Sequence, residues 1–281
     1  MAVQPETATS INIEEIEIKL LLEGVCLVYG YDFRDYALAP LRRSIAAGMA
    51  GEAVLTISAY QERLLHDPTC MRRFLNGVGV NGTSMFREAE VLRCFREDVV
   101  PRLRTYPSIR IWIAGCATGE EVYSVAIILE EEGLHQRSRI YATDLNEQSL
   151  AVARAGAYPL DRVRADEGGY IGSGGRGRFS DFYTAAGHNA RFRRELSGNI
   201  TWARHNLVTD GSFNEFHLIL CSNVLIYFKP SLQERAHRLF YDSLIRSGYL
   251  AIGQRDSLVF CPENSRYEQE RDGINLFRKV R

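Results

Sequence analysis

One segment of the sequence has residue types and a spacing suited to ligand chemistry: Ile111-Trp-Ile-Ala-Gly-Cys-Ala-Thr-Gly-Glu-Glu121. An apolar run leads into Gly115 and Gly119, and two glutamates follow at the start of the next expected helix. Glycine lets a backbone approach a bound molecule closely, and a helix N-terminus offers unpaired N–H groups. The pattern therefore predicts a nucleotide-type ligand beside the turn that follows the first strand of a sheet.

The paired glutamates, Glu120 and Glu121, narrow the class of ligand. The glycine spacing is G-x-x-x-G rather than the G-x-G-x-x-G of dinucleotide-binding proteins, which disfavours an NAD-dependent dehydrogenase. Two carboxylates would repel a pyrophosphate but attract a cationic ligand such as S-adenosylmethionine. The alternative is that both are first-turn residues favoured by the helix dipole. The sequence leaves open which of the two would contact the ligand.

Polar residues follow three further expected strands. Asp144 ends the second strand, about 25 residues past the glycine turn, where an acidic side chain accepts hydrogen bonds from ribose hydroxyls. Asn206 and Leu207 follow the third strand, and Asn223 follows the fourth. Because ligands bind outside the carboxyl ends of parallel strands, the two asparagines could read an adenine edge or line a substrate cleft. Ordinary turn chemistry is the alternative for both.

The elements that must position these residues change in character at Pro107. From Ile11 to about Leu75, apolar residues recur at helical spacing, which predicts a small all-α domain. From Ile109 onward strands and helices alternate, which predicts an α/β domain with a parallel sheet. The expected strands are 109–114, 139–143, 200–205, 216–221 and 249–253, and the expected helices are 88–103, 121–129, 147–155 and 231–244.

Residues 168–177 interrupt this alternation with six glycines in ten residues. No Lys-Ser/Thr pair follows them, so a P-loop is excluded. The composition predicts a flexible loop that leads into a small β insertion. A docking element for a partner is the alternative.

Composition and charge exclude several classes of protein. With 46% hydrophobic residues and a net charge of −1, the 281-residue chain is typical of globular proteins and has no overall attraction to nucleic acid or anionic membranes. Its apolar runs are too short to cross a bilayer, and its polar N-terminus lacks the pattern of a secretory signal, so we expect a cytoplasmic protein. The spacing of its six cysteines and six histidines predicts no metal site.

Five segments occur together, in order, that resemble the chemotaxis receptor protein-glutamate O-methyltransferases, the CheR family. They are Asn81-Gly-Thr-Ser-Met-Phe-Arg-Glu88, Ala114-Gly-Cys-Ala-Thr-Gly-Glu-Glu121, Ala142-Thr-Asp144, His205-Asn-Leu207 and Ser222-Asn-Val-Leu-Ile-Tyr-Phe228. The resemblance extends from about Leu20 to Val280. It implies an N-terminal helical domain (1–75), a linker (76–90) that contributes to the cofactor site, and a Rossmann-like methyltransferase domain (91–281) with a small antiparallel β insertion at about 168–198.

The resemblance also implies site residues and partners. By position in the family's motifs, the expected contacts to S-adenosylmethionine, or to its product S-adenosylhomocysteine, are Asn81, Thr83, Arg87, Gly115, Glu121, Asp144, Asn206, Leu207, Ser222 and Asn223. Arg87 and Tyr227 are expected to shape the methyl-transfer centre. The implied acceptors are glutamates on the cytoplasmic helices of methyl-accepting chemoreceptors, and the implied state is a monomer. A basic face on the helical domain, with Arg34, Arg42, Arg43 and Arg63 as candidates, would suit such acidic helices.

The chain departs from the family pattern at three places. Ser222 stands where the family typically has arginine, Val122 replaces a proline, and Gly253-Gln-Arg-Asp-Ser257 replaces a more common Gly-His-x-Glu-Ser. Serine cannot supply a charged or bidentate contact. A regulatory module that binds cofactor or receptor with weak or no turnover is therefore the alternative from a different class. A methyltransferase for small molecules or nucleic acids is the nearest enzyme alternative.

Overall fold

The computed structural model describes residues 12–78 and 83–280. These residues form two compact units, of which the smaller ends at Val78 and the larger includes every described residue from Thr83 onward. No helix in the described ranges is both long and apolar enough to span a membrane.

The smaller unit contains only helices among its described regular elements. They are α1 (Ile13–Tyr29), α2 (Leu38–Gly51), α3 (Ile57–His66) and α4 (Pro68–Val78). Thr56 caps α3 by accepting the backbone N–H of Ala59 at 3.2 Å. Leu21, Tyr60 and Phe74 are each at most 2% exposed, so α1, α3 and α4 contribute to one apolar core.

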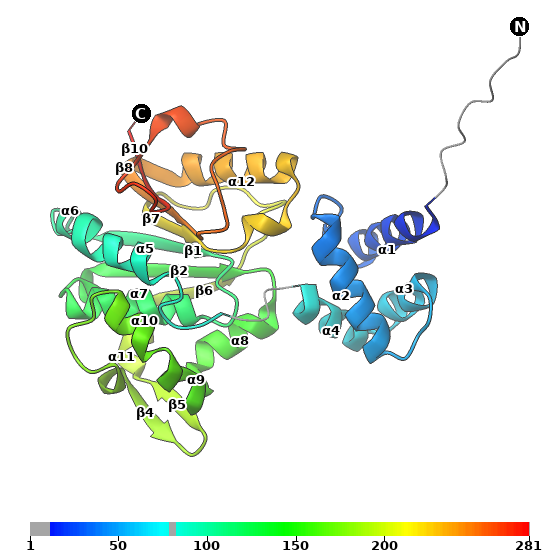
Figure 1. The fold of residues 1–281 in the computed structure, drawn as a ribbon, viewed down its shortest axis with the longest axis horizontal. Helices are drawn as coiled ribbons and strands as arrows, with labels where there is room; N and C mark the ends of the chain where they lie inside the picture. Colours follow the sequence, from blue (N-terminus) through cyan, green and yellow to red (C-terminus); the bar gives the residue numbers. More distant parts are fainter. Residues whose placement is uncertain (1–11, 79–82, 281) are drawn as a thin grey trace, which may run out of the picture. The chain divides into compact units, whose positions relative to one another are not determined.

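A seven-stranded sheet forms the centre of the larger unit (Figure 1). Its strands are β1 (Ile109–Ala114), β2 (Ser138–Asp144), β6 (Ile200–Arg204), β7 (Phe216–Cys221), β8 (Leu244–Ile252), β9 (Tyr267–Gln269) and β10 (Leu276–Lys279). The order across the sheet is β6-β2-β1-β7-β8-β10-β9. The first five are parallel, and β10 pairs antiparallel with both β8 and β9. Strands β9 and β10 were not predicted from the sequence, because their short apolar runs lie among polar turn residues.

The strand order reverses between β1 and β7. The chain runs outward from β1 to β2 on one side, and β7 pairs with the other side of β1, with Ile111 opposite Leu218. Ligands of open α/β sheets bind at the carboxyl ends of the strands at such a reversal. The turn after β1 and the turn after β7 meet at this point, and both carry candidate residues.

Helices cover both faces of the sheet, with α12 on one side and α7 and α8 on the other (Figure 1). The helices of the larger unit are α5 (Ala89–Cys94), α6 (Val100–Leu103), α7 (Glu120–Glu131), α8 (Glu147–Ala155), α9 (Leu160–Ala165), α10 (Glu167–Gly172), α11 (Arg194–Ser197) and α12 (Pro230–Ser243). A π-helical turn, Phe95–Val99, joins α5 to α6, and short 3₁₀ turns occur at 135–137, 179–182, 225–227 and 264–266. The expected Rossmann-like α/β class is confirmed.

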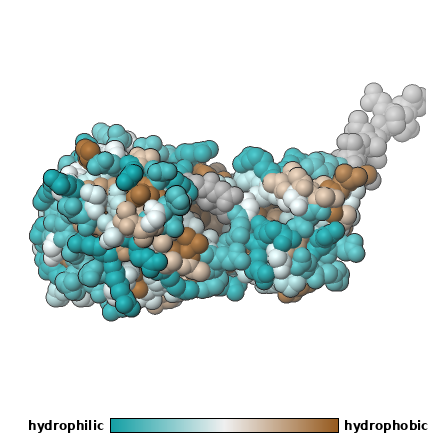
Figure 2. Space-filling model, turned by 90° about the horizontal axis from the view of Figure 1, so that it is seen from below, coloured by the Kyte–Doolittle hydropathy of each residue, from teal (hydrophilic) through white to brown (hydrophobic). Residues whose placement is uncertain are grey.

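Trp112 lies at the centre of the sheet core. Its side chain is 0% exposed, and its indole N–H donates to Thr143 Oγ1 at 2.8 Å across the β1–β2 pair. Phe216 and Phe240 contact its ring from β7 and α12. On the face drawn in Figure 2, by contrast, hydrophilic side chains cover most of both units and hydrophobic ones form small separate patches.

A second, three-stranded antiparallel sheet packs against α7. It has the order β3 (Ala157–Pro159), β5 (Asn189–Phe192), β4 (Tyr183–Ala186). Phe192 stacks on Tyr123 of α7 with ring centroids 5.0 Å apart. The expected range of this insertion, about 168–198, includes β4 and β5 but not β3, which eight residues containing α9 separate from the start of that range.

The glycine-rich segment is not simply a flexible loop, because its first half forms α10. At Gly169 a β-carbon would lie 3.0 Å from the backbone oxygen of Phe86, and at Gly175 it would overlap the ring of Tyr170. These glycines allow close packing against neighbouring groups. Composition alone could not separate that role from flexibility.

Candidate functional site

The turn after β1 is fastened to the end of β2. The backbone N–H groups of Gly115 and Cys116 donate to Thr143 O at 2.8 and 2.9 Å, and Asp144 Oδ2 accepts the N–H of Ala117 at 2.8 Å. Gly115 has φ +71°, and a β-carbon there would lie 2.6 Å from Val224 Cγ2. Glycine is therefore required by both the backbone conformation and the space available.

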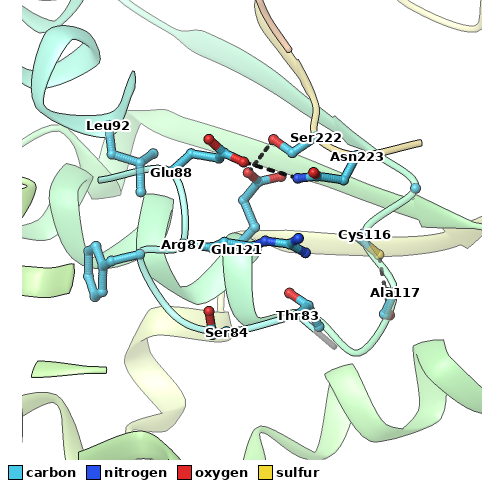
Figure 3. A pocket seen from close by; sticks show the side chains of 12 residues that line it. Thr83, Ser84, Arg87, Glu88, Leu92, Cys116, Ala117, Glu121, Ser222 and Asn223 are labelled. Carbon is cyan, nitrogen blue, oxygen red and sulfur yellow. Dashed lines mark hydrogen bonds between the residues drawn. The ribbon is translucent and has the colours of Figure 1, made fainter. Parts of the chain in front are cut away.

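A pocket opens beside this turn (Figure 3). We refer to it as the glycine-turn pocket, and all of its lining belongs to the larger unit: Thr83, Ser84, Phe86, Arg87, Glu88, Leu92, Gly115, Cys116, Ala117, Glu121, Ser222 and Asn223. Three segments far apart in sequence thus meet at the reversal point of the sheet.

The two glutamates at the start of α7 have different environments. Glu120 is 6% exposed, and its Oε2 accepts the hydroxyl of Thr118 at 2.7 Å. Glu121 lines the glycine-turn pocket, where its Oε1 accepts the hydroxyl of Ser222 at 2.6 Å (Figure 3). The geometry thus distinguishes the two residues, because Glu121 lines the glycine-turn pocket and Glu120 does not.

The pKa of Glu121 is raised to about 7, mainly because the side chain is buried. The acidic side chains of Glu88 and Asp256 also raise it, whereas the hydrogen bond from Ser222 and the charge of Arg87 lower it. A carboxylate held in this way gains free energy from a cationic ligand, because the ligand compensates the cost of ionisation.

The turn after β7 is organised around Asn223 and Asp256. Asn223 is 4% exposed and has φ +59°, a left-handed conformation that asparagine tolerates. Its side-chain amide donates to Glu88 Oε1 at 3.1 Å. Asp256 accepts three backbone N–H groups, from Asn223 at 2.7 Å, Ile226 at 3.0 Å and Gly253 at 3.2 Å. One carboxylate therefore joins the ends of β7 and β8.

The segment that precedes α5 forms the third wall. The N–H of Phe86 donates to Ser124 Oγ of α7 at 2.9 Å, and the N–H of Met85 donates to Asp166 Oδ2 at 2.8 Å. These bonds fix the segment that carries Thr83 and Arg87, and in Figure 3 the guanidinium of Arg87 lies beside Glu121. Asn81, predicted as a cofactor contact, lies outside the described residues.

Four predicted residues lie at neighbouring strand ends without contributing to this lining. Asp144 holds the turn, as described above, and Asn206 Oδ1 accepts the N–H of Val208 at 2.9 Å, which is turn chemistry. Leu207 is buried at 7% exposure, and Tyr227 ends the 3₁₀ turn 225–227.

Two polar residues of the site received no role from the sequence. Glu88 was part of a quoted motif, but nothing in its local pattern showed that it would meet Asn223. Asp256 had a signal, since it occupies the acidic position of the family's Gly-His-x-Glu-Ser segment after a strand of the same sheet. Its importance became visible only through the three amides that it holds.

The residues present suit S-adenosylmethionine on structural grounds. Gly115 lines the pocket without a side chain, and Glu121 places in the same pocket a carboxylate that a cation would compensate. Both features match a ligand that carries an ammonium group and a sulfonium centre.

Comparisons with known proteins agree with this geometry. Residues 81–273 match the family described as "CheR methyltransferase, SAM binding domain". A Pseudomonas putida protein named "Putative methyltransferase Cher3" is 45% identical over 96% of this chain and 99% of its own length. The "Chemotaxis protein methyltransferase" of Listeria innocua is 30% identical over 82% of this chain and 86% of its own length. For "Chemotaxis protein methyltransferase 2" of Pseudomonas aeruginosa, the identity is 30% over 73% of this chain and 75% of that protein.

The family match covers most of the larger unit, including every residue of the glycine-turn pocket. The chain therefore belongs to the CheR family of S-adenosylmethionine-dependent methyltransferases.

Proposed function

We propose that this protein transfers the methyl group of S-adenosylmethionine to glutamate side chains on chemoreceptor-like signalling proteins, which gives glutamate methyl esters. The observation that carries the proposal is Glu121, a carboxylate that lines a pocket at the reversal point of the sheet and accepts a hydrogen bond from Ser222. The names of the relatives, chemotaxis protein methyltransferases, support the class of acceptor. In this proposal the chain acts as a monomer in the cytoplasm, where receptor signalling helices lie.

The proposed cofactor contacts fall into two groups. Around the glycine-turn pocket they are Thr83, Arg87, Gly115, Glu121, Ser222 and Asn223. At the adjoining strand ends they are Asp144, Asn206 and Leu207, with Asn81 as a further candidate in the linker. Asp144 retains acceptor capacity for ribose hydroxyls, because a carboxylate has about four lone-pair sites and the backbone N–H groups of Ala117, Leu145 and Asn146 occupy at most three.

The chemistry needs positioning more than proton transfer. When bound, S-adenosylmethionine supplies a methyl carbon activated by a positively charged sulfur. An acceptor glutamate is already ionised at neutral pH, so no base is required. Arg87, Glu121 and Ser222 would hold the cofactor, which would offer its methyl carbon to a carboxylate oxygen of the acceptor, with the sulfur as the leaving atom. The protein must hold the three atoms in line and exclude water, and we assign this shaping to Arg87 and Tyr227.

Ser222 favours a second candidate function, a regulatory module that binds cofactor or receptor with little turnover. The serine makes one neutral hydrogen bond to Glu121, whereas the arginine typical of the family would add a charge at this place.

A methyl-transfer assay separates the two candidates. The purified protein is incubated with methyl-labelled S-adenosylmethionine and a receptor cytoplasmic fragment, and base-labile label on the fragment measures glutamate ester. A fragment with its acceptor glutamates replaced by aspartate is the control for position. We expect label on the native fragment only.

A parallel calorimetric titration with S-adenosylhomocysteine makes each outcome decisive. Binding without label would favour the regulatory module, and the absence of binding would overturn the assignment of the cofactor site itself.

A further inference from the structure

A second hollow lies at the opposite edge of the main sheet, at the amino ends of β7 and β8. We refer to it as the amino-edge groove. Its volume is about 290 Å³, close to the lower limit for small-molecule sites. Six of its lining residues carry polar or aromatic groups that matter here: Arg102, Tyr106, His217, Ser247, Tyr249 and Arg278. The length of β1 separates this edge from the glycine-turn pocket by roughly 20 Å, at about 3.3 Å per residue.

An irregularity in β8 creates the groove. Phe216 of β7 pairs with Leu244, but Leu218 pairs with Tyr249, so β8 contains three more residues than β7 between the two pairs. Ser247 in this bulge has φ +63°, a conformation that costs free energy for a residue other than glycine. The bulge lifts Ile245 and Ser247 away from the regular sheet, and both line the groove.

His217 presents a fixed hydrogen-bond donor. Its Nδ1 accepts the backbone N–H of Arg110 at 3.1 Å, which assigns the ring proton to Nε2. Burial, and then the positive charge of Arg110, lower the pKa of this histidine, so the ring is neutral and keeps that tautomer at pH 7. The ring of Tyr106 meets the imidazole edge-on at 4.6 Å between centroids.

Two arginines line the groove, and both pair with carboxylates that lie outside its lining. Arg102 and Arg278 approach the same oxygen of Glu270, at 2.8 and 3.2 Å, and Arg278 also pairs with Glu268 at 2.6 Å. Each guanidinium has five N–H donors, so these contacts leave donors for a further acceptor. The Arg102 side chain is 48% exposed, which keeps it accessible to a ligand from solvent.

The lining as a whole is rich in donors and aromatic surface. Tyr249 lies beneath the Arg102 guanidinium, with 5.8 Å from its carbon to the ring centroid. None of the nine residues that line the groove carries a carboxylate. Such a surface offers N–H donors and aromatic rings, which suits an anion with a flat ring that packs on the tyrosines while its charged group meets the unused N–H donors of the arginines.

We propose that the amino-edge groove is a second ligand site, which binds a small anion carrying one planar ring. Its phosphate or carboxylate group bonds to Arg102, Arg278 and the Nε2–H of His217, and its ring packs against Tyr106 and Tyr249. This site is independent of the proposed methyl transfer.

The test uses the full-length protein and phenyl phosphate as the probe, with inorganic phosphate for comparison. We expect saturable binding of phenyl phosphate at millimolar concentrations by calorimetry, at least threefold tighter than inorganic phosphate. We also expect it to persist when S-adenosylhomocysteine saturates the other pocket. Displacement by S-adenosylhomocysteine, or equal affinity for both probes, would overturn the proposal.

A pair of variants locates the binding. Arg278→Gln should weaken the binding of phenyl phosphate by at least fivefold. Arg271→Gln should leave it unchanged, because Arg271 is a comparably exposed arginine that pairs with Glu97 and Asp98 and does not line the groove. Equal thermal unfolding of the two variants serves as the folding control. If Arg278→Gln folds normally and binds like the native chain, the site is not the amino-edge groove.

Discussion

Glu121 is both a first-turn residue of α7 and a side chain that lines the glycine-turn pocket. Its place in the first turn of α7 favours negative charge, whereas its burial disfavours it. Ser222 is the neighbour that adjusts this balance, since its hydroxyl favours the ionised carboxylate through one bond of 2.6 Å. An arginine in place of Ser222 would favour ionisation more strongly, so this chain keeps its pocket carboxylate closer to neutral than the family pattern would.

Cofactor affinity should therefore depend on pH through Glu121. The carboxylate, rather than the protonated form, attracts the cation, so affinity rises as pH rises through about 7 and levels off above it. From about pH 6 to about pH 8 the ionised fraction of a group with this pKa grows about tenfold, and we expect the same factor in the affinity for S-adenosylmethionine. Calorimetry at the two pH values measures it.

Glu121→Gln is the matched control for this prediction. Glutamine keeps the size and one acceptor but does not titrate in this range, so the variant should bind weakly and with little pH dependence. A native-like pH profile in the variant would mean that another group controls binding.

The sequence could identify the pair of glutamates but could not choose between them. Adjacent helix positions differ by about 100° around the axis, and both Glu120 and Glu121 are compatible with a first turn. The choice depends on the turn after β7, which is about 100 residues away and brings Ser222 to one of them. Long-range contacts of this kind leave no local pattern.

At the scale of elements, the ends of β7 and β8 form one unit because Asp256 holds amides from both. Burial raises the pKa of Asp256 to about 6, while the three N–H groups oppose this shift. The free energy of the Asn223 turn thus depends on a side chain that does not line the pocket.

Asp256→Asn should weaken both the fold and the cofactor site. The amide nitrogen cannot accept a hydrogen bond, so at least one of the three backbone N–H groups loses its partner, at a cost of about 1–3 kcal/mol. We expect a lower free energy of unfolding by this amount in urea titrations, with reduced affinity for S-adenosylhomocysteine. Asp272→Asn, at an exposed position, is the control, and equal losses in both variants would contradict the role of Asp256.

The regular elements of the larger unit were largely predictable from sequence. Buried parallel strands such as 109–114 and 216–221 are continuous apolar runs between polar turns, and their bounds were found to the residue. The irregular features were not predictable. The bulge of β8 and helix α10 depend on contacts with residues distant in sequence. The local propensities of both segments are too weak to predict their structure without those contacts.

At the scale of the whole molecule, the predicted basic face of the helical unit is only partly available. Arg42 pairs with Glu14 at 3.0 Å, and Arg34 pairs with Asp32 at 2.8 Å. Arg43 and Arg63 are exposed. We propose that this unit docks acidic receptor helices. Arg43 and Arg63 then contribute more to the docking than Arg34 and Arg42, whose charges are already neutralised.

Reversing Arg43 and Arg63 to glutamate should lower kcat/KM for receptor methylation several-fold at low salt, and less at high salt where charges are screened. Reversing Arg34 and Arg42 to glutamate should have a smaller effect, because both already pair with carboxylates, and serves as the charge-matched comparison. Rates that respond equally to both changes, or to neither, would contradict docking through Arg43 and Arg63. Methyl-transfer rates at two ionic strengths provide the measurement.

The placement of Trp112 has an optical consequence. The chain has two tryptophans, and Trp112 in β1 and Trp202 in β6 both belong to the main sheet of the larger unit. Tryptophan emission during unfolding therefore follows the larger unit, while far-ultraviolet circular dichroism records the helices of both. Comparing the two signals in one melt would show whether the helical unit and the methyltransferase unit lose their structure together.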